Sequence, residues 1–409
     1  MKRWIGLVLA CLLMLAGCGT PGSGTPQTGQ MLEYPMEHSA YPGREYRAVW
    51  VSYLEWMRFD FSNEEAFRQQ CQELAQRCKA LGLNTVLAQV RPFGDALYPS
   101  QWFPWSHLCT GTQGQNPGFD PLLVLEQEVH GAGLELEAWV NPYRVKGPTG
   151  VPELSEQSLA SQYPHLVKET EQGIYLNPAS QEARDLIVKG VEELLEHYQL
   201  EGIHFDDYFY PTTDPEFDKE EYAQQGGGLS LEEWRKQNVN QLVQQVYTAI
   251  KARWPEVRFG ISPTGNIENN YDIQYSDVKL WLSEPGYVDY LMPQIYWGFG
   301  YTTSNGDTQY GFQQLVQRWA ELPRSEQVQL YVGLGAYRIG EGDGGSNVDS
   351  VSQWQKGNQL AAQVEHLRTS RMQGYGLYRY DSLFFNTVWS ELCGLEQENL
   401  ATCNQVSGE

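Results

Sequence analysis

The stretch Gly202-Ile203-His204-Phe205-Asp206-Asp207-Tyr208-Phe209-Tyr210-Pro211 decides the fold prediction. Its first half has the apolar residues of a short buried strand, which ends at two adjacent carboxylates. Successive strand residues point to opposite faces, so His204 and Asp206 share one face. Ile203 and Phe205 share the other face, where they suit packing against helices. The stretch therefore predicts a covered strand with a polar inner face and a charged end.

Seven further runs of apolar and β-branched residues have the length of buried strands, and helical patterns separate them. Eight strands that alternate with helices favour a parallel sheet, and their number favours closure into a (β/α)8 barrel, an α/β fold. The predicted strands are 46–53, 84–90, 134–140, 202–207, 257–262, 290–297, 328–336 and 374–380. The predicted helices include 64–81, 121–132, 181–198, 231–254, 310–322 and 354–371.

Loop lengths give a second reason for the barrel. Helix-to-strand connections are short, whereas strand-to-helix connections such as 91–120 and 141–179 are long. In a TIM barrel the long loops all emerge at the C-terminal ends of the strands, where active sites are built. An open doubly wound sheet is the main alternative, but no glycine-rich phosphate-binding motif follows the first strand. We therefore predict a TIM barrel with long strand-to-helix loops over residues 44–394 and a C-terminal tail over 395–409.

Residues 1–18 have the layout of a bacterial lipoprotein signal peptide. Two basic residues precede a short apolar run, and Leu15-Ala16-Gly17-Cys18 matches a lipobox, in which Cys18 is lipidated after cleavage. An ordinary secretory signal with an incidental cysteine is the alternative. Residues 19–43, rich in Gly, Pro, Ser and Thr, are typical of a flexible tether. These features predict a protein of the cell envelope that is held to a membrane by the lipid on Cys18.

The composition of the chain limits the kinds of molecule that it is expected to bind. The 51 Asp and Glu outnumber the 28 Lys and Arg, for a net charge of −23, and no basic patch is visible, which argues against a nucleic-acid partner. The 13 Trp and 25 Tyr suit stacking on the apolar faces of sugar rings. The seven Cys have no zinc spacing and no disulfide framework, although Cys393 and Cys403 could pair. No metal and no cofactor is predicted.

Polar side chains stand at the ends of six predicted strands, which would meet on one rim of a barrel. Strand alternation places Glu137 and Asn141 on the inner face of the third strand, near Asp206. Glycosidic cleavage needs two carboxyl groups, one as proton donor and one as nucleophile or base. The candidate catalytic residues are Asp206, Asp207, Glu137 and Asp95. The candidate substrate-binding residues are Arg91, Tyr98, Trp139, Asn141, Tyr143, Arg144, His204, Tyr208, Tyr210, Ser262, Asn266, Gln294, Tyr296 and Trp297. A structural alternative is that the Asp206–Asp207 pair caps the following segment or binds Ca²⁺.

Several ordered motifs carry a resemblance to a known family. They are Arg47-Ala48-Val49-Trp50-Val51, Gln89-Val90-Arg91-Pro92, Gly94-Asp95-Ala96-Leu97-Tyr98, Ala138-Trp139-Val140-Asn141-Pro142-Tyr143-Arg144, Gly202–Pro211, Gly260-Ile261-Ser262-Pro263 and Asp289-Tyr290-Leu291-Met292-Pro293-Gln294-Ile295-Tyr296-Trp297. Together they resemble the glycosyl hydrolase-like 10 family over residues 44–383. The resemblance implies an envelope-associated TIM barrel that hydrolyses bacterial cell-wall glycan between amino sugars.

A looser likeness links the third and fourth strands to α-amylase barrels, through Glu137-x-x-x-Asn141 and His204-x-Asp206. The amylase proton donor on the fifth strand has no counterpart here better than Ser262. The leading hypothesis is a lipid-anchored glycoside hydrolase of peptidoglycan glycan, with peptide-free strands favoured because the chain would repel acidic stem peptides. The alternatives are a non-catalytic glycan-binding barrel and a hydrolase of another polysaccharide such as an α-glucan.

Overall fold

The computed structural model describes residues 44–148 and 153–406. The predicted signal peptide, its Cys18 and the predicted tether over 19–43 lie outside the described residues. Within the described ranges, no helix combines the length and the apolar character needed to cross a bilayer.

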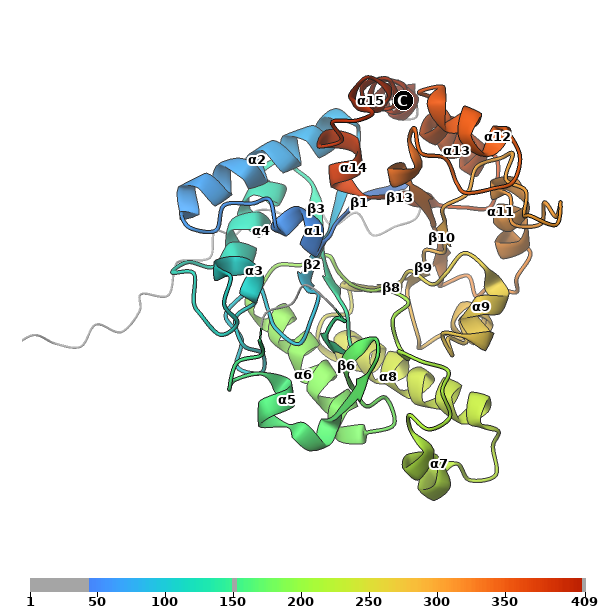
Figure 1. The fold of residues 1–409 in the computed structure, drawn as a ribbon. Coiled ribbons are helices and arrows are strands. Elements are labelled where there is room, and N and C mark those ends of the chain that lie inside the picture. Colours follow the sequence, from blue (N-terminus) through green and yellow to red (C-terminus); the bar gives the residue numbers. More distant parts are fainter. Residues whose placement is uncertain (1–43, 149–152, 407–409) are drawn as a thin grey trace, which may run out of the picture. The chain divides into compact units, whose positions relative to one another are not determined.

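The described residues form a ring of parallel strands at eight positions, surrounded by helices (Figure 1). The ring closes because β9 pairs with β8 and β11 while β10 pairs with β12, which continues through β13 to β1. This arrangement confirms the predicted (β/α)8 barrel. The strands are β1 (Tyr46–Val51), β2 (Thr85–Arg91), β3 (Glu135–Val140), β7 (Gly202–Phe205), β8 (Arg258–Ile261), β9 (Tyr290–Leu291) with β10 (Gln294–Ile295), β11 (Gln329–Leu330) with β12 (Val332–Gly335), and β13 (Gly374–Tyr378).

The sixth and seventh positions each consist of two short strands where one continuous strand is predicted. Pro293 separates β9 from β10 because a proline has no N–H to donate to the ladder. Its carbonyl oxygen still accepts a hydrogen bond from the Gly333 amide at 2.9 Å. The Tyr331 amide, between β11 and β12, likewise donates to Leu291 at 2.9 Å. The breaks therefore interrupt the strands without opening the ring.

Six helices confirm the predicted helical patterns and cover the ring: α2 (Glu64–Ala80), α4 (Pro121–Gly131), α6 (Gln181–His197), α8 (Leu231–Arg253), α11 (Phe312–Ala320) and α13 (Gln359–Arg368). Side chains just before several of them accept hydrogen bonds from first-turn amides, as at Asn63, Asp120 and Ser180. Ser230 and Glu233 form a complete capping box at α8. These caps fix where each helix begins and so how long the preceding loop is.

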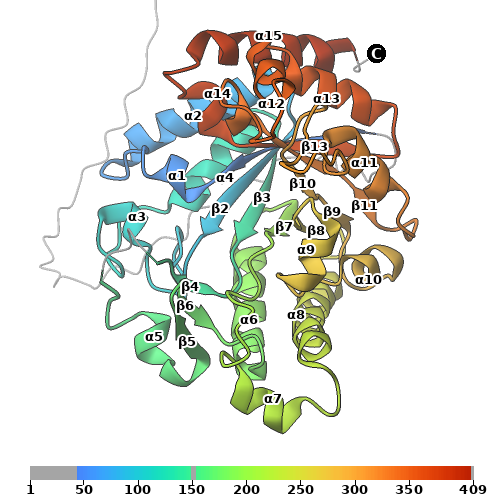
Figure 2. The ribbon, with the colours of Figure 1, turned by 45° about the vertical axis from the view of Figure 1, so that its right-hand side comes forward.

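The longest strand-to-helix loop carries structure of its own. After β3 the chain forms an antiparallel sheet of β4 (Arg144–Lys146), β5 (Val167–Thr170) and β6 (Gly173–Leu176), with α5 (Leu159–Gln162) in the loop between β4 and β5. Figure 2 shows this sheet beyond the arrowheads of β2 and β3. The Gly94 amide, in the loop after β2, donates to Val145 at 3.1 Å. The loops at the C-terminal ends of the strands are therefore joined to one another.

The C-terminal tail predicted from residue 395 is wrong, because α15 (Ser390–Val406) runs through it. Leu400 on this helix is fully buried, and the carboxylate of Glu396 accepts hydrogen bonds from the first amides of α13. Cys393 and Cys403, whose pairing was left open, form no disulfide with each other; their positions on one helix place them ~15 Å apart. Cysteine, glutamate and asparagine at inward positions hide the helical pattern in the sequence.

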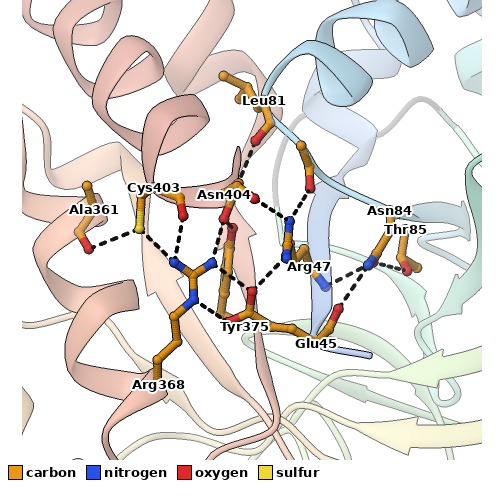
Figure 3. A network of polar contacts seen from close by, with 11 residues as sticks. Glu45, Arg47, Leu81, Asn84, Thr85, Ala361, Arg368, Tyr375, Cys403 and Asn404 are labelled. Atoms are coloured by element: carbon orange, nitrogen blue, oxygen red, sulfur yellow. Dashed lines mark hydrogen bonds and ion pairs between the residues drawn. The ribbon is translucent and has the colours of Figure 1, made fainter. Parts of the chain in front are cut away.

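Figure 3 shows how α15 is tied to the start of β1. The carboxylate of Glu45 pairs with Arg368 at 2.7 Å and with Arg47 at 2.7 Å. Asn404 on α15 accepts hydrogen bonds from Arg368 at 2.9 Å and from Tyr375 at 2.9 Å. Its own amide group donates to the carbonyl of Leu81 at 2.7 Å. The helix is thus an integral wall of the barrel.

Removal of residues 394–409 should destabilise the protein by more than about 3 kcal/mol, because it exposes the surface under Leu400 and deletes the Glu396 cap. The free energy of unfolding from urea denaturation measures this loss. Removal of residues 407–409 alone is the matched control and should change nothing. An unchanged free energy after the longer deletion would show that α15 contributes little to stability.

Candidate active site

Asp206 and Asp207 follow the fourth strand position, β7, and both carboxylates are buried, with 4% and 8% of each residue exposed. Asp206 accepts hydrogen bonds from the Trp139 indole at 3.3 Å, from the Tyr208 amide at 3.3 Å and from the Asn141 amide group. Trp139 lies in β3 and Asn141 directly follows it. β3 pairs with β7 so that Trp139 is opposite His204, which brings the end of β3 beside Asp206. The predicted approach of the third strand to Asp206 is therefore confirmed for Asn141.

Asp207 has a different set of partners. Its two carboxylate oxygens accept hydrogen bonds from the side-chain amides of Gln294 at 3.2 Å and Gln274 at 3.3 Å. Gln294 also donates to the carbonyl of Ser262 at 2.8 Å, which fixes its orientation. Asp207 thus faces the fifth and sixth strand positions, whereas Asp206 faces the third.

The two carboxyl groups differ in how well their charged forms are stabilised. Burial raises the pKa of Asp206, and the charge of Arg144 and the hydrogen bonds from Tyr208, Asn141 and Trp139 oppose that rise. Burial and the neighbouring charge of Asp206 raise the pKa of Asp207 to about 7. The charge of Arg144 and the larger number of donors favour the charged form of Asp206 more than that of Asp207. With a pKa of about 7, Asp207 has a proton available near neutral pH.

His204 lies below the pair on the inner face of β7, as predicted. Its Nδ1 contacts the Tyr290 hydroxyl at 2.8 Å, and its Nε2 contacts the Trp50 indole at 3.2 Å and the Ser262 hydroxyl at 3.0 Å. An indole N–H can only donate, so Nε2 is the acceptor and the proton is on Nδ1. Burial lowers the pKa of His204 to about 3, so this ring is a neutral support for the strand ends.

Glu137 does not lie beside Asp206, contrary to the prediction. It pairs with Gly202 across the sheet, at the other end of β7, and its carboxylate contacts Arg258 at 2.7 Å and the Tyr290 hydroxyl at 2.6 Å. Four strand residues separate it from Asn141, a rise of ~13 Å. Strand alternation predicted the correct face for Glu137, but it did not predict how far along the barrel axis the residue lies. Glu137 is a structural ion-pair partner, which also removes the support for the amylase-like arrangement.

Asp95 is held inside the loop after β2. Its carboxylate contacts His107 at 3.1 Å and Gln113 at 3.2 Å, and both partners belong to the same loop. These contacts make Asp95 a brace of that loop, and none of them joins it to the acidic pair. The proposed pairing of Asp95 with Asp206 is therefore not what the structure shows.

Aromatic side chains and one arginine surround the open side of the acidic pair. Tyr208 is 51% exposed beside Asp206. Tyr296 stacks on Tyr378 at a centroid distance of 5.4 Å and meets Tyr337 edge-on at 5.6 Å. The guanidinium of Arg144 lies over Phe93 at 4.9 Å, on the other side of the site. Such faces suit sugar rings.

Several predicted substrate-binding residues lie elsewhere. Arg91 is fully buried with its guanidinium over Phe103, because the pairing of β2 with β3 shifts register between Gln89 and Arg91 and turns the side chain outward, toward α6. Tyr98 packs against Tyr198 at 5.9 Å. These side chains support the outer layer of the barrel and have no contact with the site.

Four further predictions are corrected in the same way. Tyr143 is fully buried near Arg184, and Tyr210 accepts a hydrogen bond from Asn238 at 3.1 Å. Asn266 caps α9 (Ile267–Asp272) with its side chain. Trp297 packs on Tyr301 within the loop after β10. Beyond the end of a strand, alternation no longer tells which way a side chain points.

The sequence reasoning missed Gln274, Tyr337, Tyr378 and the pair Tyr53 and Phe93. Tyr378 was detectable, because it alternates with Gly376 and Gly374 along β13 and must face inward with them. Gln274 lies in an irregular segment after α9 and reaches Asp207 only through the tertiary fold. Within residues 44–148 and 153–406, no cluster of three His, Cys, Asp or Glu side chains could hold a metal ion.

Two solved structures with a similar fold are glycoside hydrolases. The glycoside hydrolase domain of PgaB (BpsB) from Bordetella bronchiseptica has a TM-score of 0.57 at 16% identity, over 86% of this chain and 99% of that domain. The α-L-fucosidase isoenzyme 2 of Paenibacillus thiaminolyticus has a TM-score of 0.54 at 13% identity, over 89% of this chain and 50% of that one. These similarities place the fold among the TIM barrels of glycoside hydrolases.

The chain belongs to the glycosyl hydrolase-like 10 family, whose sequence profile matches residues 45–354. It is 37% identical to the glycosyl hydrolase YngK of Bacillus subtilis (strain 168) over 333 residues, which is 76% of this chain but 64% of YngK. It is 34% identical to the glycosyl hydrolase DigH of Escherichia coli (strain K12) over 373 residues, 82% of this chain and 83% of DigH. The resemblance seen in the sequence is thereby confirmed, and family and fold together indicate a glycoside hydrolase.

Arg258→Gln should destabilise the protein by about 3–5 kcal/mol, because it leaves Glu137 as an uncompensated buried charge. Urea denaturation measures the change. The double variant Arg258→Gln with Glu137→Gln should recover part of the loss, since the fully buried charge is then gone. Glu135, which also pairs with Arg258, keeps Arg44 at 3.6 Å. A single variant as stable as the wild type would contradict the assigned ion pair.

Proposed function

We propose that this glycoside hydrolase cleaves the glycan strands of peptidoglycan, from a position on the outer side of the membrane to which Cys18 is lipid-linked. The observation that carries the proposal is the pair of adjacent buried carboxyl groups at the end of β7, each held by its own set of hydrogen-bond donors. A surface that only binds glycan has no need of two adjacent buried carboxyl groups. A glycosidase needs such a pair at the bond that it breaks.

The two carboxyl groups take separate roles in this proposal. Asp207 gives its proton to the leaving-group oxygen, since its raised pKa keeps a proton available near pH 7. Asp206 acts as an anion held by Asn141, Trp139 and the Tyr208 amide, and stabilises the positive charge that develops at the sugar. Water then adds to the anomeric carbon and gives a proton back to the Asp207 carboxylate, which completes the hydrolysis. Tyr296 and Tyr378 offer ring faces on which the flanking sugars can stack.

The substrate class rests on three supports. The family resemblance implies cell-wall glycan, and the predicted lipid anchor would place the barrel beside the wall. The net charge of −23 disfavours strands that carry acidic stem peptides, so peptide-free glycan is the preferred form. The amylase-like spacing no longer supports an α-glucan substrate, because Glu137 is bound to Arg258 and is distant from the acidic pair.

Asp206→Asn and Asp207→Asn should each reduce hydrolysis of purified sacculi by about 10²–10⁴-fold, because each removes one half of the acid–base pair. Release of new reducing ends, from sacculi with and without stem peptides, measures the loss. The exposed Asp185→Asn is the matched control and should retain full activity. Variants that keep full turnover would exclude a catalytic role for the pair, and no reducing ends from any wild-type reaction would contradict the proposal itself.

Activity should follow a bell-shaped pH profile. The acid Asp207 is present below its raised pKa, so the rate falls as the pH rises through about 7. The rate also falls at low pH, where Asp206 becomes protonated. An aryl glycoside with an activated leaving group needs no proton donor, so its cleavage should lose the alkaline limb and survive Asp207→Asn. An unchanged alkaline limb on that substrate would contradict the assignment of Asp207 as the acid.

A further inference from the structure

Arg144 lies at the start of β4, where loops from four strand ends meet. Its Nε donates to the carbonyl of Pro92 at 2.9 Å, which fixes one edge of the guanidinium. The rings of Phe93, Tyr208 and Tyr53 lie around it, at 4.9, 5.7 and 6.0 Å from the guanidinium carbon to each centroid. The side chain is half-buried and held in place.

This cation has no ion-pair partner among the residues that the structure describes, although the chain carries 51 acidic residues. Its guanidinium lies beside the ring of Tyr208, whose amide donates to Asp206 at 3.3 Å. The charge of Arg144 also opposes the rise in the pKa of Asp206. Arg235, by contrast, is an arginine used for structure, since it is fully buried and binds Asp218 at 2.6 Å. Among the residues that the structure describes, none accepts a hydrogen bond from either terminal nitrogen of Arg144.

A guanidinium surrounded by aromatic rings and fixed through its Nε still presents a planar edge, and that edge matches a carboxylate through two parallel hydrogen bonds. A neutral hydroxyl or amide would leave most of that interaction unused. The rings also exclude water from one side of the cation, which strengthens its attraction for an anion. The ligand that this geometry fits is therefore a carboxylate next to the cleaved bond.

We propose that Arg144 binds a free carboxylate carried by the sugar at the cleavage site. This inference rests on the proposed function, since in peptidoglycan glycan that group is the lactyl carboxylate of the muramyl residue. A stem peptide converts the carboxylate into a neutral, bulky amide. Arg144 is then the residue that distinguishes the two forms, and a reaction that hydrolyses the lactyl–peptide amide must supply the preferred substrate.

Two forms of one glycan test the role of Arg144. Peptide-free muramyl oligosaccharide is compared with the same oligosaccharide after its lactyl carboxylates are coupled to methylamine, which removes the charge and adds little bulk. Binding to the purified chain carrying Asp207→Asn is measured by calorimetry, so the comparison does not depend on hydrolysis. The carboxylate form should bind about tenfold to a hundredfold more tightly, the usual range for a charged hydrogen-bonded pair.

Adding Arg144→Gln should abolish this preference, with little change in the affinity for the amidated form. Arg144→Lys should keep part of it, because the charge remains while the planar edge is lost. Arg253→Gln, on an arginine that pairs with Glu196 at the end of α8, is the matched control and should keep the full preference.

Equal binding of the two forms, binding of neither, or a preference that survives Arg144→Gln would each overturn the inference. An equal loss for both forms would do the same, since it would make Arg144 a positioning residue only. Wild-type hydrolysis of the two glycans is measured in parallel. A chain that binds with the expected preference but never cleaves supports the assignment of Arg144 and contradicts the proposed function.

Discussion

The ion pair between Arg258 and Glu137 supports the polar interior of the barrel. Arg258 pairs with Glu137 inside the ring and favours its charged form, and Glu137 accepts a hydrogen bond from the Tyr290 hydroxyl. That leaves Tyr290 as an acceptor for Nδ1–H of His204, which sets the tautomer of the ring. Gly260 makes room for this arrangement, since a Cβ there would lie 1.9 Å from the Tyr290 ring.

The same chain of contacts continues upward to the acidic pair. Nε2 of His204 meets the hydroxyl of Ser262, and the carbonyl of Ser262 accepts from Gln294. Gln294 in turn donates to Asp207. A continuous line of buried hydrogen bonds thus connects the base of the barrel to the residue that holds the proton. Each buried polar group has a partner on this line, which is why so polar an interior can be stable.

Periodicity and loop length were enough to predict the barrel, because both report on burial along each strand. They also placed His204 and Asp206 on the inner face. They could not give the level of Glu137 in the barrel, since alternation fixes a side and not a depth. They also missed the register shift that turns Arg91 outward, because a bulge depends on the pairing of two strands. Gln274 reaches Asp207 only through tertiary structure, which no local pattern records.

The network around Glu45 also has a mechanical consequence. β1 is hydrogen-bonded on both sides, to β2 and to β13. At its start, Glu45 pairs with Arg368, and Arg47 donates to the carbonyl of Asn404 on α15. A pulling force applied at residue 44 would therefore load many parallel hydrogen bonds and an ion-pair cluster together, in shear. Such a junction yields only at high force. A catalytic barrel held at this point could be dragged along or pulled against a rigid polymer without beginning to unfold from its leading end.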